Sequence, residues 1–151
     1  MKIIFLDFDG VLNSERYFRS YGAEGLALNS ENLCFLKEIV VATGAKIVLS
    51  TSWREHWEKD DSKCSAMGVE MNEIFKKYEM EIFDKTPFSC ISREQDIEDW
   101  LMAHPDTQAF VVLDDRFLDS PVLRGHFVKT DPYIYGLDEA EKDAAIKILM
   151  Q

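Results

Sequence analysis

The chain has 151 residues and a formal net charge of −11, with an isoelectric point near 4.7. This length fits a single domain over residues 1–151, which buries roughly two thirds of its unfolded surface in one core. The acidic balance repels a nucleic-acid backbone and argues against extended nucleic-acid binding, although a bound cation and one or two basic side chains can still hold a single phosphate.

The cysteines and the apolar runs indicate the compartment. Cys34, Cys64 and Cys90 are odd in number and form no C-x-x-C pair, which argues against both a disulfide framework and a zinc site. No apolar run is long enough to span a bilayer, and no signal-like segment opens the sequence. We therefore expect a cytoplasmic protein with no membrane partner.

The first predicted element is a short buried strand over residues 3–6, which stops abruptly at Asp7 and Asp9. Gly10 lets the backbone turn directly behind them, so both carboxylates can converge at the carboxyl end of a parallel strand. Two carboxylates about 4 Å apart repel by roughly 4 kcal/mol at an effective dielectric constant near 20. A divalent cation such as Mg²⁺ is the simplest partner for them. The alternative is an ordinary strand that ends in a turn.

Residues 14–28 contain Gly, Tyr and Ser without a clear period, and we expect a loop or flap over the end of the first strand. A helix follows, because apolar residues recur at helical spacing between a cap at Asn29 or Ser30 and Gly44. Residues 45–49 form the next buried strand. Strand, helix and strand together predict a βαβ unit.

The second strand also ends in polar residues, here Ser50, Thr51 and Ser52. Their hydroxyl groups are candidates to bind a phosphoryl group. Thr51 is the preferred residue, and Ser50 and Ser52 are alternatives if the strand ends one residue earlier or later. Ordinary helix capping explains the same three residues equally well.

The rest of the chain continues the alternation of helices and strands. The third long apolar strand ends at Asp114 and Asp115, with Asp119 four residues further on. The predicted elements are two helices over residues 53–78 broken near Met67-Gly68, a strand over 81–83, a helix from Ser92 to His104, strands over 109–113 and 126–129, and a helix over 137–150.

This order predicts an α/β fold with a doubly wound parallel sheet. Three apolar strands end in acidic or hydroxyl side chains, and the carboxyl ends of parallel strands meet at one crevice. The sequence therefore predicts one shared site for a phosphate and a metal ion.

Four segments resemble, in this order, the motifs of the haloacid dehalogenase (HAD) superfamily: Asp-Phe-Asp-Gly-Val, a strand ending in Ser/Thr, a basic residue, and Leu-Asp-Asp. Asp-Gly-Val-Leu-Asn together with Leu-Ser-Thr-Ser-Trp-Arg is similar to small phosphatase-like HAD domains found alone or attached to RNA-repair proteins. The resemblance implies a Rossmannoid three-layer sandwich. The intervals between the motifs leave room for a flap but no large cap domain.

The resemblance also implies roles for the acidic residues. Asp7 would be the nucleophile that forms an aspartyl-phosphate, and Asp9 would be the general acid and base. Mg²⁺ would be held by Asp7, by the backbone carbonyl of Asp9 and by Asp115, with Asp114 and Asp119 in supporting positions.

The phosphoryl group would contact Thr51 or Ser52 and one basic side chain. Arg93 fits the basic position of the family best, and Lys85 is the alternative. The alternative is that either residue is a solvated charge at the surface, where most Lys and Arg side chains lie.

The implied function is a Mg²⁺-dependent phosphomonoesterase. Its substrate would be a phosphorylated small molecule or an exposed phosphate on a macromolecule, with a nucleotide or a nucleic-acid end among the candidates. Trp53, Arg54 and Trp57 could line the approach to the site and stack on a base, although helix packing is the alternative and is favoured for Trp57. The rival functions are a HAD-fold regulatory or binding module with weak catalysis and a metal-independent 2-haloacid dehalogenase.

Overall fold

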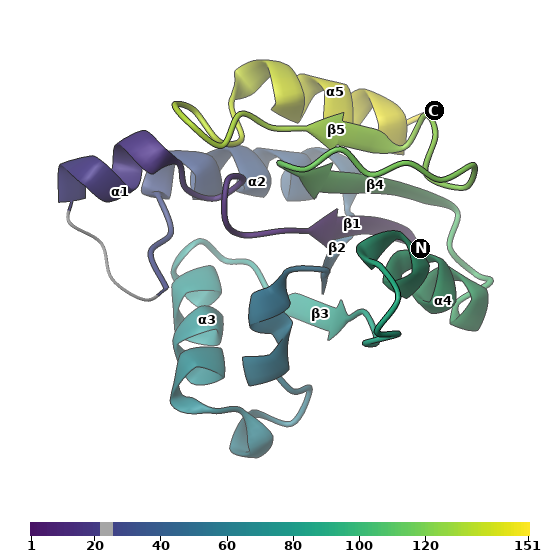
Figure 1. Cartoon of the computed structure of the whole chain (residues 1–151), viewed down its shortest axis with the longest axis horizontal. Coiled ribbons are helices and arrows are strands. Elements are labelled where there is room, and N and C mark those ends of the chain that lie inside the picture. The colour runs from purple at the N-terminus through teal and green to yellow at the C-terminus, as the bar shows by residue number, and fades with distance from the viewer. Residues whose placement is uncertain (22–25) are drawn as a thin grey trace.

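The computed structural model describes residues 1–21 and 26–151, and the strands of this part form one parallel sheet (Figure 1). The strand order is β3-β2-β1-β4-β5. The strands are β1 (Lys2–Leu6), β2 (Lys46–Leu49), β3 (Ile82–Lys85), β4 (Ala109–Asp114) and β5 (Phe127–Lys129). From β1 the chain continues to β2 and β3 on one side, and then crosses to β4 and β5 on the other side of β1. The topological switch point therefore lies between β1 and β4.

Helices cover both faces of the sheet and make the predicted three layers. They are α1 (Glu15–Tyr21), α2 (Ser30–Thr43), α3 (Ala66–Lys77), α4 (Arg93–Ala103) and α5 (Glu139–Leu149). Side chains of α2, α3 and α5 share one apolar core with alternate residues of β1, β2 and β4. Side chains of α4 and of the segment after β4 share the second core with the other face of these strands. Figure 1 shows α2 beside α5 and α4 apart from both.

Local capping explains where the predicted helices begin and end. The Asn29 side chain accepts a hydrogen bond from the backbone N–H of Glu31, and Gly44 ends α2 in the left-handed conformation with φ of +69°. The Ser92 hydroxyl accepts a hydrogen bond from the backbone N–H of Gln95 at the start of α4. These boundaries agree with those expected from the sequence.

The expected loop over residues 14–28 is wrong in part, because α1 occupies Glu15–Tyr21. This helix has no buried residue, so no apolar period signals it. Its first turn is held from outside, where the N–H groups of Glu15 and Arg16 donate to the carbonyls of Pro132 and Tyr133. Residues 22–25 of the expected flap lie outside the described residues.

The expected break near Met67-Gly68 is also wrong. The segment after β2 forms two short 3₁₀ turns, η1 (Ser52–His56) and η2 (Asp61–Lys63), and Gly68 lies inside α3. A Cβ atom at Gly68 would lie 2.1 Å from the carbonyl oxygen of His56. Gly68 therefore permits close packing of α3 on η1, and this contact, not a helix break, explains the glycine.

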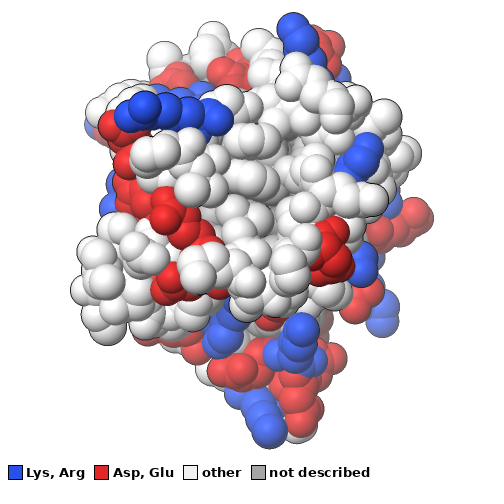
Figure 2. All heavy atoms as spheres, turned by 90° about the vertical axis from the view of Figure 1, so that its right-hand side faces the viewer, with Lys and Arg blue, Asp and Glu red and all other residues white. Residues whose placement is uncertain are grey.

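The described residues between the strands contain only these helices and turns, and no inserted unit of the size of a cap domain. No helix among them has the length and hydropathy needed to cross a membrane. The three cysteines are free thiols. On the face drawn in Figure 2, Lys and Arg side chains are scattered among Asp and Glu, beside a broad uncharged area, and form no continuous basic surface.

Candidate active site

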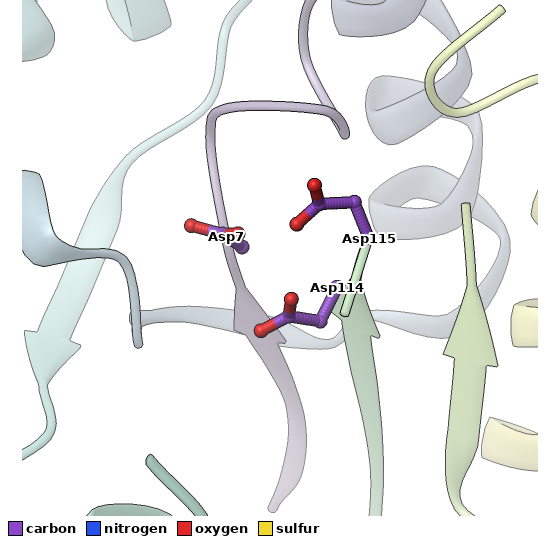
Figure 3. A group of neighbouring side chains, drawn as sticks. All are labelled: Asp7, Asp114 and Asp115. Carbon is purple, nitrogen blue, oxygen red and sulfur yellow. The ribbon is translucent and has the colours of Figure 1, made fainter. Parts of the chain in front are cut away.

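The end of β1 and the end of β4 bring three carboxylates together at the switch point. Asp7 directly follows β1, and its backbone N–H donates to the carbonyl of Leu113 at 3.0 Å, which extends the ladder between the two strands. Asp7, Asp114 and Asp115 each offer a carboxylate oxygen, and these oxygens lie within 4.8 Å of one another. Figure 3 shows the side chains of Asp114 and Asp115, at the end of β4, pointing toward the end of β1 that carries Asp7.

Gly10 makes room for this arrangement. Its φ of +81° turns the chain directly after the first acidic pair, and a Cβ atom there would lie 2.6 Å from the carboxyl carbon of Asp115. Thr130, which follows β5, donates its hydroxyl to the Gly10 carbonyl at 2.7 Å and its backbone N–H to the Asp114 carbonyl at 3.0 Å. Thr130 therefore ties the turn after β1 to the end of β4, where the other two acids lie.

Arg93, the first residue of α4, lies at the acidic group. Its Nη1 atom lies 2.9 Å from Asp7 Oδ2 and 2.6 Å from Asp114 Oδ2. All three side chains are largely withdrawn from solvent, with Asp114 completely buried. The fold therefore brings Arg93 to the acids, and its role as the basic residue that binds the phosphoryl group stays a prediction.

Lys85 and Asp119 do not join this group. The Lys85 ammonium donates to the carbonyl of Trp57 at 2.6 Å and forms an ion pair with Glu58 at 3.0 Å, so it holds the end of η1. Asp119 is exposed and lies 3.4 Å from Arg124. The structure gives neither residue a contact with the candidate site.

Burial and mutual repulsion perturb the acids. Burial and, after it, the charge of Asp114 raise the pKa of Asp7 to about 7, although Arg93 opposes both effects. Burial and Asp114 also raise the pKa of Asp115. Three ionised carboxylates against one guanidinium leave two negative charges, which is the charge that one divalent cation balances. An all-oxygen donor set of this kind suits Mg²⁺.

The Asp9 side chain lies outside the three-carboxylate group. It is exposed, and its Oδ2 atom accepts a hydrogen bond from the indole N–H of Trp53 at 2.9 Å. Its Oδ1 atom accepts one from the amide of Asn13 at 3.1 Å. The metal role expected for the backbone carbonyl of Asp9 stays a prediction.

The hydroxyl groups after β2 differ in their surroundings. Thr51 is buried, and its oxygen accepts a hydrogen bond from the backbone N–H of Trp53 at 3.3 Å, which leaves its proton free to be donated. Ser52 is exposed. Ser50 is completely buried, and its hydroxyl has no hydrogen-bond partner among the described residues. Capping explains part of the Thr51 environment, and the assignment of the phosphate-binding hydroxyl stays a prediction.

Arg54 has a role that sequence reasoning missed. Its buried guanidinium donates to four backbone carbonyls and forms an ion pair with Asp96 of α4 at 2.8 Å. Phe88 packs against it, 3.8 Å from the guanidinium carbon to the ring centre. Trp57 is buried as expected for helix packing, and its indole N–H donates to Asn72. No local pattern pairs Arg54 with a residue 42 positions away.

A parallel α/β sheet whose switch point carries three acids and one arginine defines the class of the protein. Residues 3–141 match the family described as the HAD domain in Swiss Army Knife RNA repair proteins, and the chain belongs to this family. It is therefore a member of the HAD superfamily, as the motifs predicted, and the assignment supports a HAD-type hydrolase. Comparisons with curated proteins and with solved structures gave no match.

Proposed function

We propose that this protein is a Mg²⁺-dependent phosphomonoesterase that works through an aspartyl-phosphate on Asp7. The observation that carries the proposal is the position of Asp7 between a guanidinium and two further carboxylates at the switch point. Its Oδ1 atom accepts a hydrogen bond from the backbone N–H of Phe8 at 2.9 Å, and its Oδ2 atom faces Arg93. The carboxylate is thus oriented before a substrate arrives.

The proposed reaction has two displacements. In the first, an Asp7 oxygen bonds to phosphorus while the bond to the leaving oxygen breaks, and that oxygen takes the proton of Asp9. In the second, a water oxygen bonds to phosphorus while the Asp7–phosphorus bond breaks, and Asp9 takes a proton from the water. Arg93 and the Thr51 or Ser52 hydroxyl would bind the phosphoryl oxygens.

Mg²⁺, held by Asp7, Asp115 and the backbone carbonyl of Asp9 with Asp114 in support, would neutralise the negative charge that separates a carboxylate from a phosphate. Asp115 suits direct contact because it is partly exposed, whereas Asp114 is completely buried and faces Arg93. The three-carboxylate group also disfavours metal-independent dehalogenation, in which repelling acids have no evident use.

The substrate class is proposed from two features. The family is described by its occurrence in RNA-repair proteins, and the half-buried indole of Trp53 lies beside Asp9. Both favour a phosphorylated nucleotide or nucleic-acid end. We also infer that residues 1–151 act as one hydrolase domain in the cytoplasm, where the free thiols of the three cysteines would stay reduced.

The first experiment measures phosphate release from an aryl phosphate with Mg²⁺, with chelator, and with Asp7→Asn. We expect turnover with Mg²⁺ and none in the other two reactions. Asp119→Asn is the matched control, because this exposed carboxylate lies outside the site. A regulatory module would show no turnover and no beryllofluoride adduct at Asp7, and a dehalogenase would release halide from a 2-haloacid without metal.

The second experiment ranks substrates. Nucleotides, sugar phosphates and oligonucleotides phosphorylated at either end are compared by kcat/KM at a fixed Mg²⁺ concentration. We expect nucleotides or oligonucleotide ends to exceed sugar phosphates. A preference for sugar phosphates would contradict the substrate class and leave the phosphatase chemistry intact.

A further inference from the structure

The indole of Trp53 and the amide of Asn13 together hold the carboxyl group of Asp9. Trp53 Nε1 donates to one oxygen at 2.9 Å, and Asn13 Nδ2 donates to the other at 3.1 Å. The described residues offer this exposed carboxylate no other hydrogen bond. Two donors from different segments therefore set its orientation.

Neither donor can accept a proton from Asp9. An indole N–H is a donor only. The Asn13 amide is oriented by two other contacts: its oxygen accepts from the Gly10 N–H at 2.8 Å, and its nitrogen donates to the Ala27 carbonyl at 2.9 Å. A proton on Asp9 must therefore occupy a lone pair that faces away from both Trp53 and Asn13.

We propose that Trp53 is a positioning residue for acid–base catalysis by Asp9, an inference that rests on the phosphatase function proposed above. The indole and the Asn13 amide each occupy one lone pair of the carboxyl group, so Asp9 would exchange its proton with the leaving oxygen or the attacking water through one of the remaining lone pairs. In the first displacement the proton leaves Asp9 from such a lone pair, and in the second a water proton returns to it. Trp53 itself neither gains nor loses a proton.

The position of Trp53 on η1 supports this role. The Trp53 backbone N–H donates to the Thr51 hydroxyl oxygen, so the turn that carries the candidate phosphate-binding hydroxyl also carries the indole. Arg54 braces the same turn by donating to the Thr51 carbonyl at 2.9 Å. The phosphoryl group and the acid that protonates its leaving oxygen are thus located by one braced turn.

The test is Trp53→Phe, which keeps an aromatic ring and removes the N–H. General acid catalysis contributes about 10²- to 10⁴-fold and matters most for poor leaving groups. Trp53→Phe keeps Asp9 itself, so it should lose only part of this contribution. We therefore expect kcat/KM to fall about tenfold for an alkyl phosphate, while the value for dinitrophenyl phosphate stays nearly unchanged. A loss of equal size on both substrates would overturn the inference, since misfolding or poorer phosphate binding affects both alike.

Two further variants separate positioning from packing. Trp53→His places an imidazole Nε2 along the same bond path as the indole Nε1, and we expect it to recover part of the alkyl phosphate activity. Trp57→Phe is the matched control, because its indole N–H in the same segment donates to Asn72. It should lower the melting temperature without changing the ratio of the two substrates.

A double-mutant cycle closes the test. If Trp53 acts through Asp9, Trp53→Phe added to Asp9→Asn produces no further loss on the alkyl phosphate. Additive losses would overturn the inference. A wild-type chain that hydrolyses neither phosphate would instead refute the phosphatase function and, with it, this role of Trp53.

Discussion

Asp115 occupies the space that a side chain at residue 10 would need. A Cβ atom on Gly10 would lie 2.6 Å from the Asp115 carboxyl carbon, at a backbone φ of +81°. The glycine of the first motif is thus required by an acid of the last motif, 105 residues later. Because Gly10 has no side chain, it both permits the turn after β1 and leaves room for Asp115 beside Asp7.

Gly10→Ala should therefore weaken Mg²⁺ binding, because Asp115 must move away from Asp7. Gly125→Ala is the matched control: Gly125 has the same φ of +81° and no atom within 4 Å of a Cβ position, so it carries only the backbone strain of roughly 1–2 kcal/mol. The measurement is the rise in melting temperature on adding Mg²⁺. We expect this rise in the wild type and in Gly125→Ala, and a clearly smaller one in Gly10→Ala. Equal rises in the two variants would contradict the dependence of the site on Gly10.

The pKa of Asp7 makes the stability of the metal-free protein depend on pH. Burial and Asp114 raise this pKa from 3.8 to about 7, so between these values the folded state holds a proton that the unfolded state has lost. This contribution to the free energy of unfolding is complete below pH 3.8 and is lost as pH rises through 7. Asp7→Asn has no carboxyl group to titrate at this position.

Urea unfolding in the presence of chelator, at pH 5 to 8, measures the difference between the wild type and Asp7→Asn. We expect the free energy of unfolding of the wild type to fall relative to the variant as pH rises. Added Mg²⁺ should stabilise the wild type more at pH 8 than at pH 5, because the cation binds the ionised carboxylate. A difference that stays constant across this range would show that the Asp7 carboxyl titrates alike in both states.

Arg93 and Lys85 should differ sharply when each is changed to Gln. Arg93 faces Asp7 and Asp114, and removing a charged donor of this kind costs about 10²- to 10³-fold in kcat. Lys85 contacts the carbonyl of Trp57 and the carboxylate of Glu58, so Lys85→Gln should cost about 1 kcal/mol of stability and leave turnover nearly unchanged. Aryl phosphate turnover and urea unfolding measure both. A greater loss of turnover in Lys85→Gln would reverse the assignment of the basic residue.

Much of the fold could be predicted because local signals and tertiary structure agree. The strands that end at Asp7 and Asp114 are apolar on both faces, and α2 has a cap at Asn29 and a left-handed glycine at its end. The helix α1 could not be predicted, because it buries no residue and its first turn is held by a segment more than 110 residues away. Tertiary contacts, which single-sequence patterns do not carry, decided that element.

Part of the candidate site could likewise be predicted from the sequence, and part could not. The strand ends located Asp7, Asp114 and Asp115, because sheet topology alone brings the ends of β1 and β4 together. The contact of Trp53 with Asp9 depends on the path of η1, where a polar 3₁₀ turn stands in place of the start of the first of the two expected helices. Side-chain contacts between irregular segments leave no periodic trace in the sequence.

Arg54→Lys should destabilise the protein strongly although the charge is kept. All five N–H bonds of the guanidinium are used: Nε donates to Thr86, Nη1 to the Ser50 and Thr51 carbonyls, and Nη2 to the Pro87 carbonyl and Asp96. An ammonium has three donors, so at least two acceptors lose their partner, at about 1–3 kcal/mol each.

Arg124→Lys is the matched control for this change, because Arg124 forms an exposed pair with Asp119 that is worth less than about 1 kcal/mol. Urea unfolding should show a loss of several kcal/mol for Arg54→Lys, of the order expected for a buried pair that is broken, and almost none for Arg124→Lys. Because Arg54 links η1 to Asp96 on α4, which also carries Arg93, kcat/KM should fall for every substrate and independently of the leaving group. Equal stability of the two lysine variants would show that the buried guanidinium does not hold these segments together.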